Sequence, residues 1–174
     1  PSGDIVVGSV AVTPSDNVGV TQRFTAAGVW DGAFASSGFA LFGFAIPIVS
    51  QVYSVLSRPD GSLVSLGHVG YASTLQSLSA NGIPSGAVDP YGITRVLGPN
   101  SASVFTSGAL AGNGRTFAVG ITTNVGTVNA PFMARFEASG ALHPTFPAAP
   151  LARVSEMSTG AAAAVQADAV LSTG

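Results

Sequence analysis

The chain has 174 residues, of which 47% are hydrophobic and 8% charged, with 22 Gly, 11 Pro and no Cys. Apolar segments must therefore be short and often interrupted by turns, which favours an all-β chain over a helical bundle, and the lack of Cys excludes disulfides, thiol catalysis and Cys-ligated zinc. All six basic residues are Arg, scattered along the chain, so no stretch suited to nucleic acid appears, and no apolar run reaches the roughly 18 residues of a membrane span.

Two short phrases recur along the chain. The first is a turn followed by a strand that closes on a glycine: PSGDIVVG (1–8), PDGSLVSLG (59–67), GNGRTFAVG (112–120) and a degenerate ADAVLSTG (167–174), which makes Gly8, Gly67 and Gly120 equivalent. The second phrase aligns without a gap: RFTAAGVWDGAF (23–34), SLSANGIPSGAV (77–88) and RFEASGALHPTF (135–146). Both phrases share a period of about 55 residues, which indicates a repeat architecture.

Each unit has room for four short strands joined by glycine-containing turns. In unit two, the apolar pattern predicts strands over 51–57, 62–67 and 73–80, and a fourth within 82–97. The Pro-Asp-Gly turn at 59–61 fits a hairpin, because Pro presets φ and Gly accepts a positive φ. Stretch 158–171 is Ala-rich and could form a helix, but the repeat alignment favours strands there.

Four-stranded units at this period are typical of β-propeller blades. The predicted fold is therefore all-β, a β-propeller segment with three repeats that forms part of a larger ring. The repeats are expected at about 1–57, 58–111 and 112–167, with the start of a fourth at 168–174. A β-sandwich is the alternative, although it gives no reason for turn phrases to recur at a fixed spacing.

The phrases PDGSLVSLG and ARFEASGALHPTF resemble the bacterial delta-60 β-propeller repeat. In that repeat, a Pro-Asp-Gly turn and a strand precede an Arg-Phe strand, a Gly turn and an Asp-x-x-Phe ending. Asp31 keeps the acidic position, whereas Ser85 and His143 replace it in the other units. The resemblance implies a propeller with an NHL-like strand order, common on exported or surface-associated bacterial proteins. It implies no single activity and no catalytic residue, and the expected location is extracytoplasmic: periplasmic, secreted or cell surface.

In the NHL-like order, the chain starts at strand two of one blade and stops after strand two of a later one. Propellers have four to eight blades, so three periods cannot close a ring. The expected partner is therefore a second fragment of the same precursor or a second copy of this chain; the alternative is that these 174 residues are part of a longer chain. Either one would cover the exposed edge strands.

Ligands of propellers bind where loops from successive blades converge at one mouth of the channel. In the NHL-like order, this mouth is lined by the loops after strand two and by the interblade loops. The candidate ligand-binding residues are His68, Tyr71, Asn100, Asn124 and Asn129. His68 follows the strand-two glycine, where Ser9 and Ile121 are expected in the other units, so it departs from the repeat.

Other side chains fit structural roles. Arg23 and Arg135 recur at one repeat position and are expected to bond neighbouring carbonyls. Aromatic residues Trp30, Phe34 and Phe146 are expected to pack between blades, and His143 is expected at the surface. No metal site is predicted, since the Asp-Gly and Asn-Gly turns supply at most one carboxylate each and the two histidines are far apart in sequence.

Two functions remain open. The first is a binding or scaffold propeller that acts through its loop-lined face and needs no catalytic motif or cofactor. The second is a hydrolase of the esterase, lactonase or glycosidase kind, matured by proteolytic processing, in which His68 acts as base with Glu156 or Asp16 nearby. Catalytic signatures such as the Walker loop and G-x-S-x-G are absent from the sequence.

Overall fold

The chain folds almost entirely into β-strands. The structure, a computed structural model, describes residues 3–14, 16–43, 49–86, 89–96, 102–123, 130–144, 149–150, 162–166 and 169–173. Within these ranges the only helical element is a short 3-10 turn, η1 (Phe34–Ser36). The predicted all-β class is confirmed.

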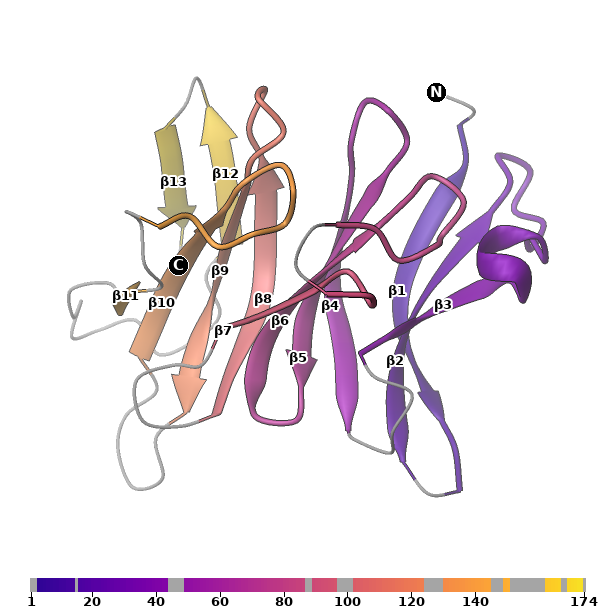
Figure 1. Cartoon of the computed structure of the whole chain (residues 1–174), viewed down its shortest axis with the longest axis horizontal. Helices are drawn as coiled ribbons and strands as arrows, with labels where there is room; N and C mark the ends of the chain where they lie inside the picture. Colours follow the sequence, from indigo (N-terminus) through magenta and orange to yellow (C-terminus); the bar gives the residue numbers. More distant parts are fainter. Residues whose placement is uncertain are drawn as a thin grey trace.

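The strands form three antiparallel sheets, which follow one another in chain order along the long axis, and one further strand pair, which lies beside the third sheet (Figure 1). The first sheet has the order β1 (Ile5–Val12), β2 (Asn17–Phe24), β3 (Phe39–Phe42). The second has the order β4 (Ser50–Ser57), β5 (Leu63–Val69), β6 (Ala72–Leu78), β7 (Ile93–Val96). The third has the order β8 (Ala102–Leu110), β9 (Thr116–Thr123), β10 (Ala130–Phe136), β11 (Ala149–Pro150). The pair consists of β12 (Ala162–Gln166) and β13 (Ala169–Thr173).

The four strands predicted for unit two are confirmed, as β4 to β7. The Ala-rich stretch after residue 160 also forms strands, β12 and β13, and not a helix. Each sheet therefore runs through its strands in chain order, which is the meander expected of sequential hairpins.

The second phrase forms the same turn three times. Gly28, Gly82 and Gly140 have φ angles of 77°, 79° and 86°, a left-handed conformation that glycine adopts without steric cost. The amide of each donates to the carbonyl three residues earlier, at 2.8, 2.9 and 2.9 Å. The gap-free alignment of this phrase is therefore matched by equal local geometry.

The first phrase needs a correction in unit one. Gly67 pairs with Thr74 and Gly120 with Phe132, and the equivalent pair in unit one joins Ser9 to Val20. Gly8 thus precedes by one residue the position that is equivalent to Gly67. The residue equivalent to His68 is therefore Val10 rather than Ser9. The turn glycines Gly3, Gly61 and Gly114 are the correct anchors, since each has a positive φ and faces an alanine of the neighbouring turn. A one-residue shift reverses the face of every side chain, so it changes which residues correspond.

Successive sheets pack in a constant way. The first strand of each later sheet lies against the sheet before it: β4 against β1 and β2, β8 against β4, β5 and β6, and β12 against β8 and β9. A serine hydroxyl recurs at two of these contacts. The amide of Gly19 donates to Ser50 Oγ at 2.9 Å, and the amide of Ser73 donates to Ser103 Oγ at 3.1 Å.

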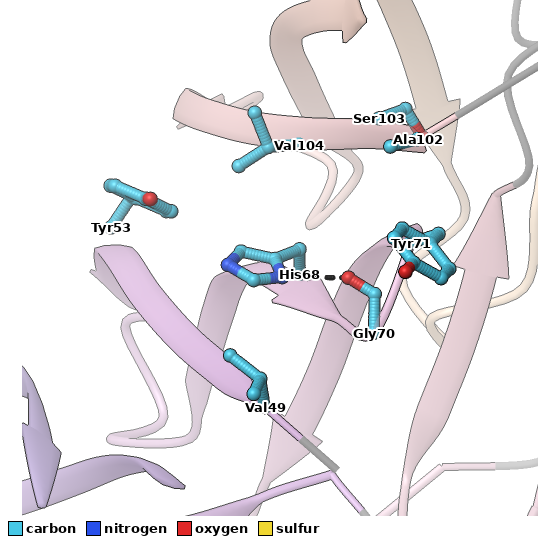
Figure 2. A pocket seen from close by; sticks show the side chains of 8 residues that line it. All are labelled: Val49, Tyr53, His68, Gly70, Tyr71, Ala102, Ser103 and Val104. Carbon is cyan, nitrogen blue, oxygen red and sulfur yellow. Dashed lines mark hydrogen bonds between the residues drawn. The ribbon is translucent and has the colours of Figure 1, made fainter. Parts of the chain in front are cut away.

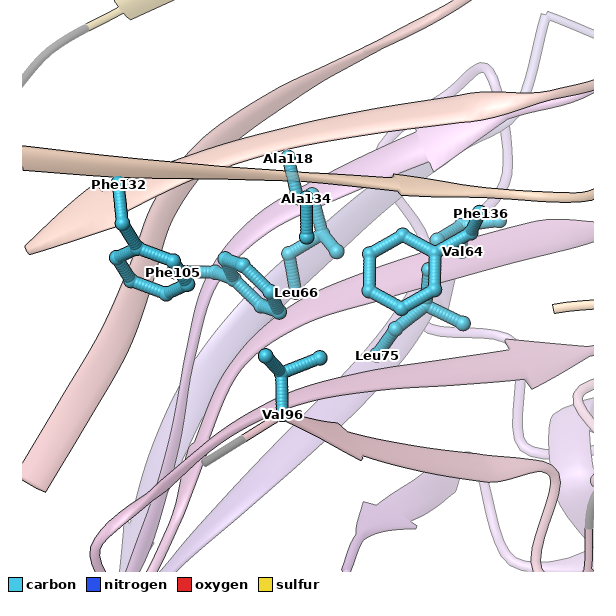
Figure 3. Packing of buried hydrophobic residues seen from close by; sticks show 9 residues of the cluster. All are labelled: Val64, Leu66, Leu75, Val96, Phe105, Ala118, Phe132, Ala134 and Phe136. Atoms are coloured by element: carbon cyan, nitrogen blue, oxygen red, sulfur yellow. The ribbon is translucent and has the colours of Figure 1, made fainter. Parts of the chain in front are cut away.

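The largest core cluster joins the second and third sheets (Figure 3). The ring of Phe105 is stacked on Phe132, with 5.2 Å between centroids, and meets the ring of Phe136 edge-on at 5.8 Å. The other buried members are Val64, Leu66, Leu75, Val96, Ala118 and Ala134. Between the first and second sheets, Phe34, Ala40, Leu63 and Leu78 form the corresponding cluster.

Arg23 links the first sheet to the second, which confirms its predicted structural role. Its Nη1 donates to the Ala80 carbonyl at 2.6 Å. Its Nε and Nη2 contact Asp31 Oδ2 at 2.8 and 2.6 Å, and its guanidinium carbon lies 5.0 Å from the centroid of the Phe34 ring. We call Arg23, Asp31 and Phe34 the unit-one clamp.

The equivalent cluster in unit three is different. His143 takes the place of Asp31, and its Nε2 lies 3.2 Å from Glu137 Oε1. Glu137 also accepts from Arg115 Nε at 3.0 Å. Arg135 Nε has no hydrogen-bond partner in the part of the chain that the structure describes, and its guanidinium lies 5.7 Å from the Phe117 ring.

Two smaller predictions were wrong. His143 is not a surface residue, because its side chain is only 15% exposed. Trp30 is 51% exposed rather than packed between sheets, and its indole N–H donates to the Gly38 carbonyl at 3.2 Å. Phe34 is fully buried as predicted, while Phe146 lies outside the described residues. The indole ring instead lies against Gly38, where the missing side chain leaves room for it.

Candidate functional site

The turns after the second strand of successive sheets lie at one end of the molecule. The β1–β2 turn and the β5–β6 turn are both at the lower end in Figure 1, where β4 and β8 begin. Asp16 lies in the first of these turns and Tyr71 in the second, with His68 close to the end of β5. Asn100, Asn124, Asn129 and Glu156 lie outside the described residues.

A pocket of about 540 Å³ opens at this end between the second and third sheets. His68 and Tyr71, two of the predicted binding residues, both line it, whereas Asp16 is not among its lining residues. The remaining lining residues are Val49, Tyr53, Gly70, Ala102, Ser103 and Val104 (Figure 2). None of the lining side chains is an acid or an arginine, so the lining is apolar with a few neutral polar groups.

Tyr53 reaches the pocket because of a β-bulge. The pairing of β4 with β5 shifts between Val52 and Ser54, which leaves Tyr53 as the extra residue. Such a bulge redirects a side chain and strengthens the local twist. The same shift occurs between Phe105 and Ser107 in the third sheet, where the extra residue is Thr106. Sequence reasoning missed Tyr53, since its alternating strand pattern gives no sign of a bulge.

The bulges explain the recurring glycines. A Cβ on Gly67 would lie 1.8 Å from the Gln51 carbonyl oxygen, and one on Gly120 would lie 1.9 Å from the Val104 carbonyl oxygen. Both carbonyls belong to backbone just before the bulge. Only glycine allows the two strands to approach this closely.

His68 lies at the centre of the lining, between Tyr53 and Tyr71 in Figure 2. Its Nδ1 is 2.9 Å from the Gly70 carbonyl oxygen. A carbonyl only accepts, so Nδ1 carries the proton and Nε2 of the neutral ring is an acceptor. No partner for Nε2 is found among the described residues. The ring is tilted by 33° against that of Tyr53, with 6.1 Å between centroids.

The two tyrosines differ in how they are held. Tyr53 is half exposed, and its hydroxyl donates to Gln51 Oε1 at 2.9 Å. Tyr71 is 80% exposed and follows Gly70, whose φ of 59° fits the first central position of a two-residue hairpin turn. The tight turn therefore places an aromatic ring at the rim of the pocket.

Among the described lining residues, Ser103 is the one serine, and its hydroxyl has a structural role. It accepts from the Ser73 amide and donates to the Val96 carbonyl at 3.2 Å. Ser50, its equivalent in the second sheet, accepts the same kind of bond from Gly19. A hydroxyl with both roles filled by backbone groups is poorly suited to nucleophilic attack.

A second pocket, of about 640 Å³, lies beside the unit-one clamp, between the start of β1 and the β4–β5 turn. Arg58 lines it. The pKa of its guanidinium is lowered, because the effect of burial is larger than the opposite effect of the Asp60 charge. Its Nε and Nη2 are buried and lack partners among the described residues. Because these two atoms are covered, a ligand in this pocket could not reach them without a rearrangement.

No cluster of three or more His, Cys, Asp or Glu residues that could hold a metal ion occurs in the described ranges. None of their helices is long and apolar enough to cross a membrane. No family model, curated protein or solved structure matches the chain.

Proposed function

We propose that this chain is part of a β-propeller that acts as a binding module, with the ligand held in the pocket between the second and third sheets. The observation that carries the function is the convergence of unit-two side chains on one pocket. Tyr53 and His68 occupy the positions that Thr106 and Ile121 occupy in unit three. The strand pairing and the bulge around these positions are the same in both units. Residues that depart from a repeated frame and meet at one site are suited to recognition.

The propeller is supported by the constant packing of each sheet on the next. It is also supported by the outer face of the first sheet. Ile5 and Val7 are 49% and 38% exposed, whereas the equivalent Leu63 and Ser65 are 3% and 0% exposed beneath the first sheet. A further sheet of the same kind would bury them. In this proposal, that sheet comes from a second fragment of the precursor or from a second copy of the chain.

Cysteine labelling tests the ring, because the chain has no Cys of its own. The variant Val7→Cys is compared with Val12→Cys. Val12 lies on the same strand and is 82% exposed. In the protein as it is isolated from its source, a maleimide should react much more slowly at position 7 than at position 12. Equal rates would mean that nothing covers the first sheet and would contradict the ring.

The hydrolase alternative has less support. His68 could act as a base through Nε2, but none of the described residues that line the pocket is a carboxylate, and Ser103 is held by backbone groups. The partners foreseen for His68 are Asp16, which does not line the pocket, and Glu156, which lies outside the described residues. The geometry therefore favours binding over catalysis.

Binding itself is tested by NMR on chain carrying carbon-13 in its Tyr and His rings. Titration with a set of neutral fragments of different chemistry should shift the ring signals of Tyr53, His68 and Tyr71 together. The signals of Tyr91, an exposed tyrosine outside the pocket, should not move. If no fragment moved the three pocket signals at high concentration, the binding function would fall.

A further inference from the structure

The chemistry of the pocket indicates what kind of ligand it takes, on the basis of the proposed binding function. The described residues of its lining carry no charged side chain, so a phosphate, a carboxylate or a polybasic segment would find no counter-ion among them. A volume of about 540 Å³ is within the range of small-ligand sites. The ligand is therefore a neutral group about the size of one or two rings.

The rings of the pocket suit a flat, partly apolar partner. Tyr53, His68 and Tyr71 follow one another along the lining (Figure 2). Both tyrosines are substantially exposed, so their faces are available for stacking. An aromatic side chain combines a large apolar face with a polar tip, which suits a ligand with an apolar face and a hydroxylated rim.

The hydrogen-bonding groups distinguish between the neutral ligands. Tyr53 already donates its proton to Gln51, and Nδ1 of His68 donates to the Gly70 carbonyl. What remains at these two side chains are acceptors, the phenol oxygen of Tyr53 and Nε2 of neutral His68, while the hydroxyl of Tyr71 can both donate and accept. A proline-rich peptide offers carbonyl acceptors and few donors, so it is a poor match. A sugar offers many hydroxyl donors.

We infer that the pocket binds a neutral saccharide, with the apolar face of a sugar ring stacked on Tyr53 and one hydroxyl donating to His68 Nε2. The backbone keeps this acceptor in place. The Nδ1–H bond to Gly70 fixes both the tautomer and the orientation of the imidazole.

The test is a set of NMR titrations of the ring-labelled chain with cellotetraose, maltotetraose, a proline decamer and phenol. We expect at least one tetrasaccharide to shift the signals of Tyr53, His68 and Tyr71 in a saturable way. Tyr53→Ala should weaken that binding by about tenfold, the loss of one good stacking contact. Tyr91→Ala, which removes an exposed tyrosine elsewhere, should leave the affinity unchanged.

The acceptor role of His68 has its own matched pair. His68→Gln keeps an acceptor oxygen and should bind more tightly than His68→Leu, which has none. Equal affinities of these two variants would overturn the hydroxyl contact. Because both substitutions are made at the pocket surface, the dispersed amide spectrum of each variant should remain that of the parent.

The remaining outcomes distinguish failure of the saccharide inference from failure of the binding function. If the proline decamer or phenol shifted the pocket signals and neither saccharide did, the saccharide inference would be wrong and the binding function would stand. If none of the four probes moved the signals, the saccharide inference would be wrong, and the wider fragment titration would decide the binding function.

Discussion

The second and third sheets are built on the same frame and differ at one end. Both have four antiparallel strands, a bulge at the same position of the first strand, and a glycine opposite that bulge. In the first half of β4 and near the end of β5, the second sheet carries Tyr53 and His68, and the third sheet carries Thr106 and Ile121 at the equivalent positions. The strand pairing, the bulge and the glycine are thus the same in both sheets, because the backbones pack closely there. The side chains that differ are found at the pocket.

This comparison separates two kinds of constraint. The glycines allow backbone to approach backbone within a sheet, and the recurring serine hydroxyls accept from backbone amides of the neighbouring sheet, so substitution at either should destabilise the fold. The pocket side chains are only lightly packed, so substitution there should affect recognition more than folding.

Replacing Gly67 by Ala should have the largest effect on stability. The new Cβ would lie 1.8 Å from the Gln51 carbonyl oxygen, so the bulge must open, at a cost of about 3 kcal/mol. Gly112→Ala is the control, since nothing lies within 4 Å of a Cβ there, and it should change stability little. Urea denaturation of the two variants measures the difference, and equal midpoints would refute the close contact.

The unit-one clamp should give a loss of stability in acid. The hydrogen bond from Arg23 holds the pKa of Asp31 below its ordinary value of 3.8. A carboxylate with a depressed pKa stabilises the fold above its unfolded pKa, and this contribution is lost as the pH falls through the folded value. At pH 7, Asp31→Asn should therefore be less stable than the parent, and the gap should narrow below about pH 4.

Urea midpoints of both proteins between pH 7 and pH 3 measure this gap. Unit three provides the comparison, because the pKa of Glu137 is also lowered, mainly by Arg115, from an ordinary value of 4.5. Glu137→Gln should also be less stable than the parent at pH 7, and this difference in stability should also narrow in acid. A gap for Asp31→Asn that stayed constant down to pH 3 would contradict the role of the ionised carboxylate.

The smallest effect on stability is expected when unit two is given the residues of unit three. The double variant Tyr53→Thr and His68→Ile copies Thr106 and Ile121 into an equivalent frame, so its stability should change by no more than about 1 kcal/mol. Any ligand response at the pocket should disappear. Thermal denaturation and the ring-signal titration of Tyr71 together measure both outcomes. A large fall in the melting temperature would mean that the two frames are less alike than their pairing indicates.

The strands of unit two could be predicted from the sequence because local signals agree there. Apolar runs, a Pro-Asp-Gly turn and an Asn-Gly turn all divide the chain at the same places. Unit one was harder, because the glycines of its strand are ambiguous. Gly8 imitates the closing glycine, and only the pairing of Ser9 with Val20 reveals the true register.

By itself, the sequence determined the all-β class, the repeat and its glycine turns, since these depend on interactions between residues close together in the chain. It also indicated His68 and Tyr71 as residues worth attention. Tertiary structure alone decided that Tyr53 joins them and that Ser103 is held by the neighbouring sheet. The first follows from the pairing of β4 with β5, where a single extra residue at the bulge determines which side chain reaches the pocket. The second follows from a contact between β6 and β8, in two different sheets.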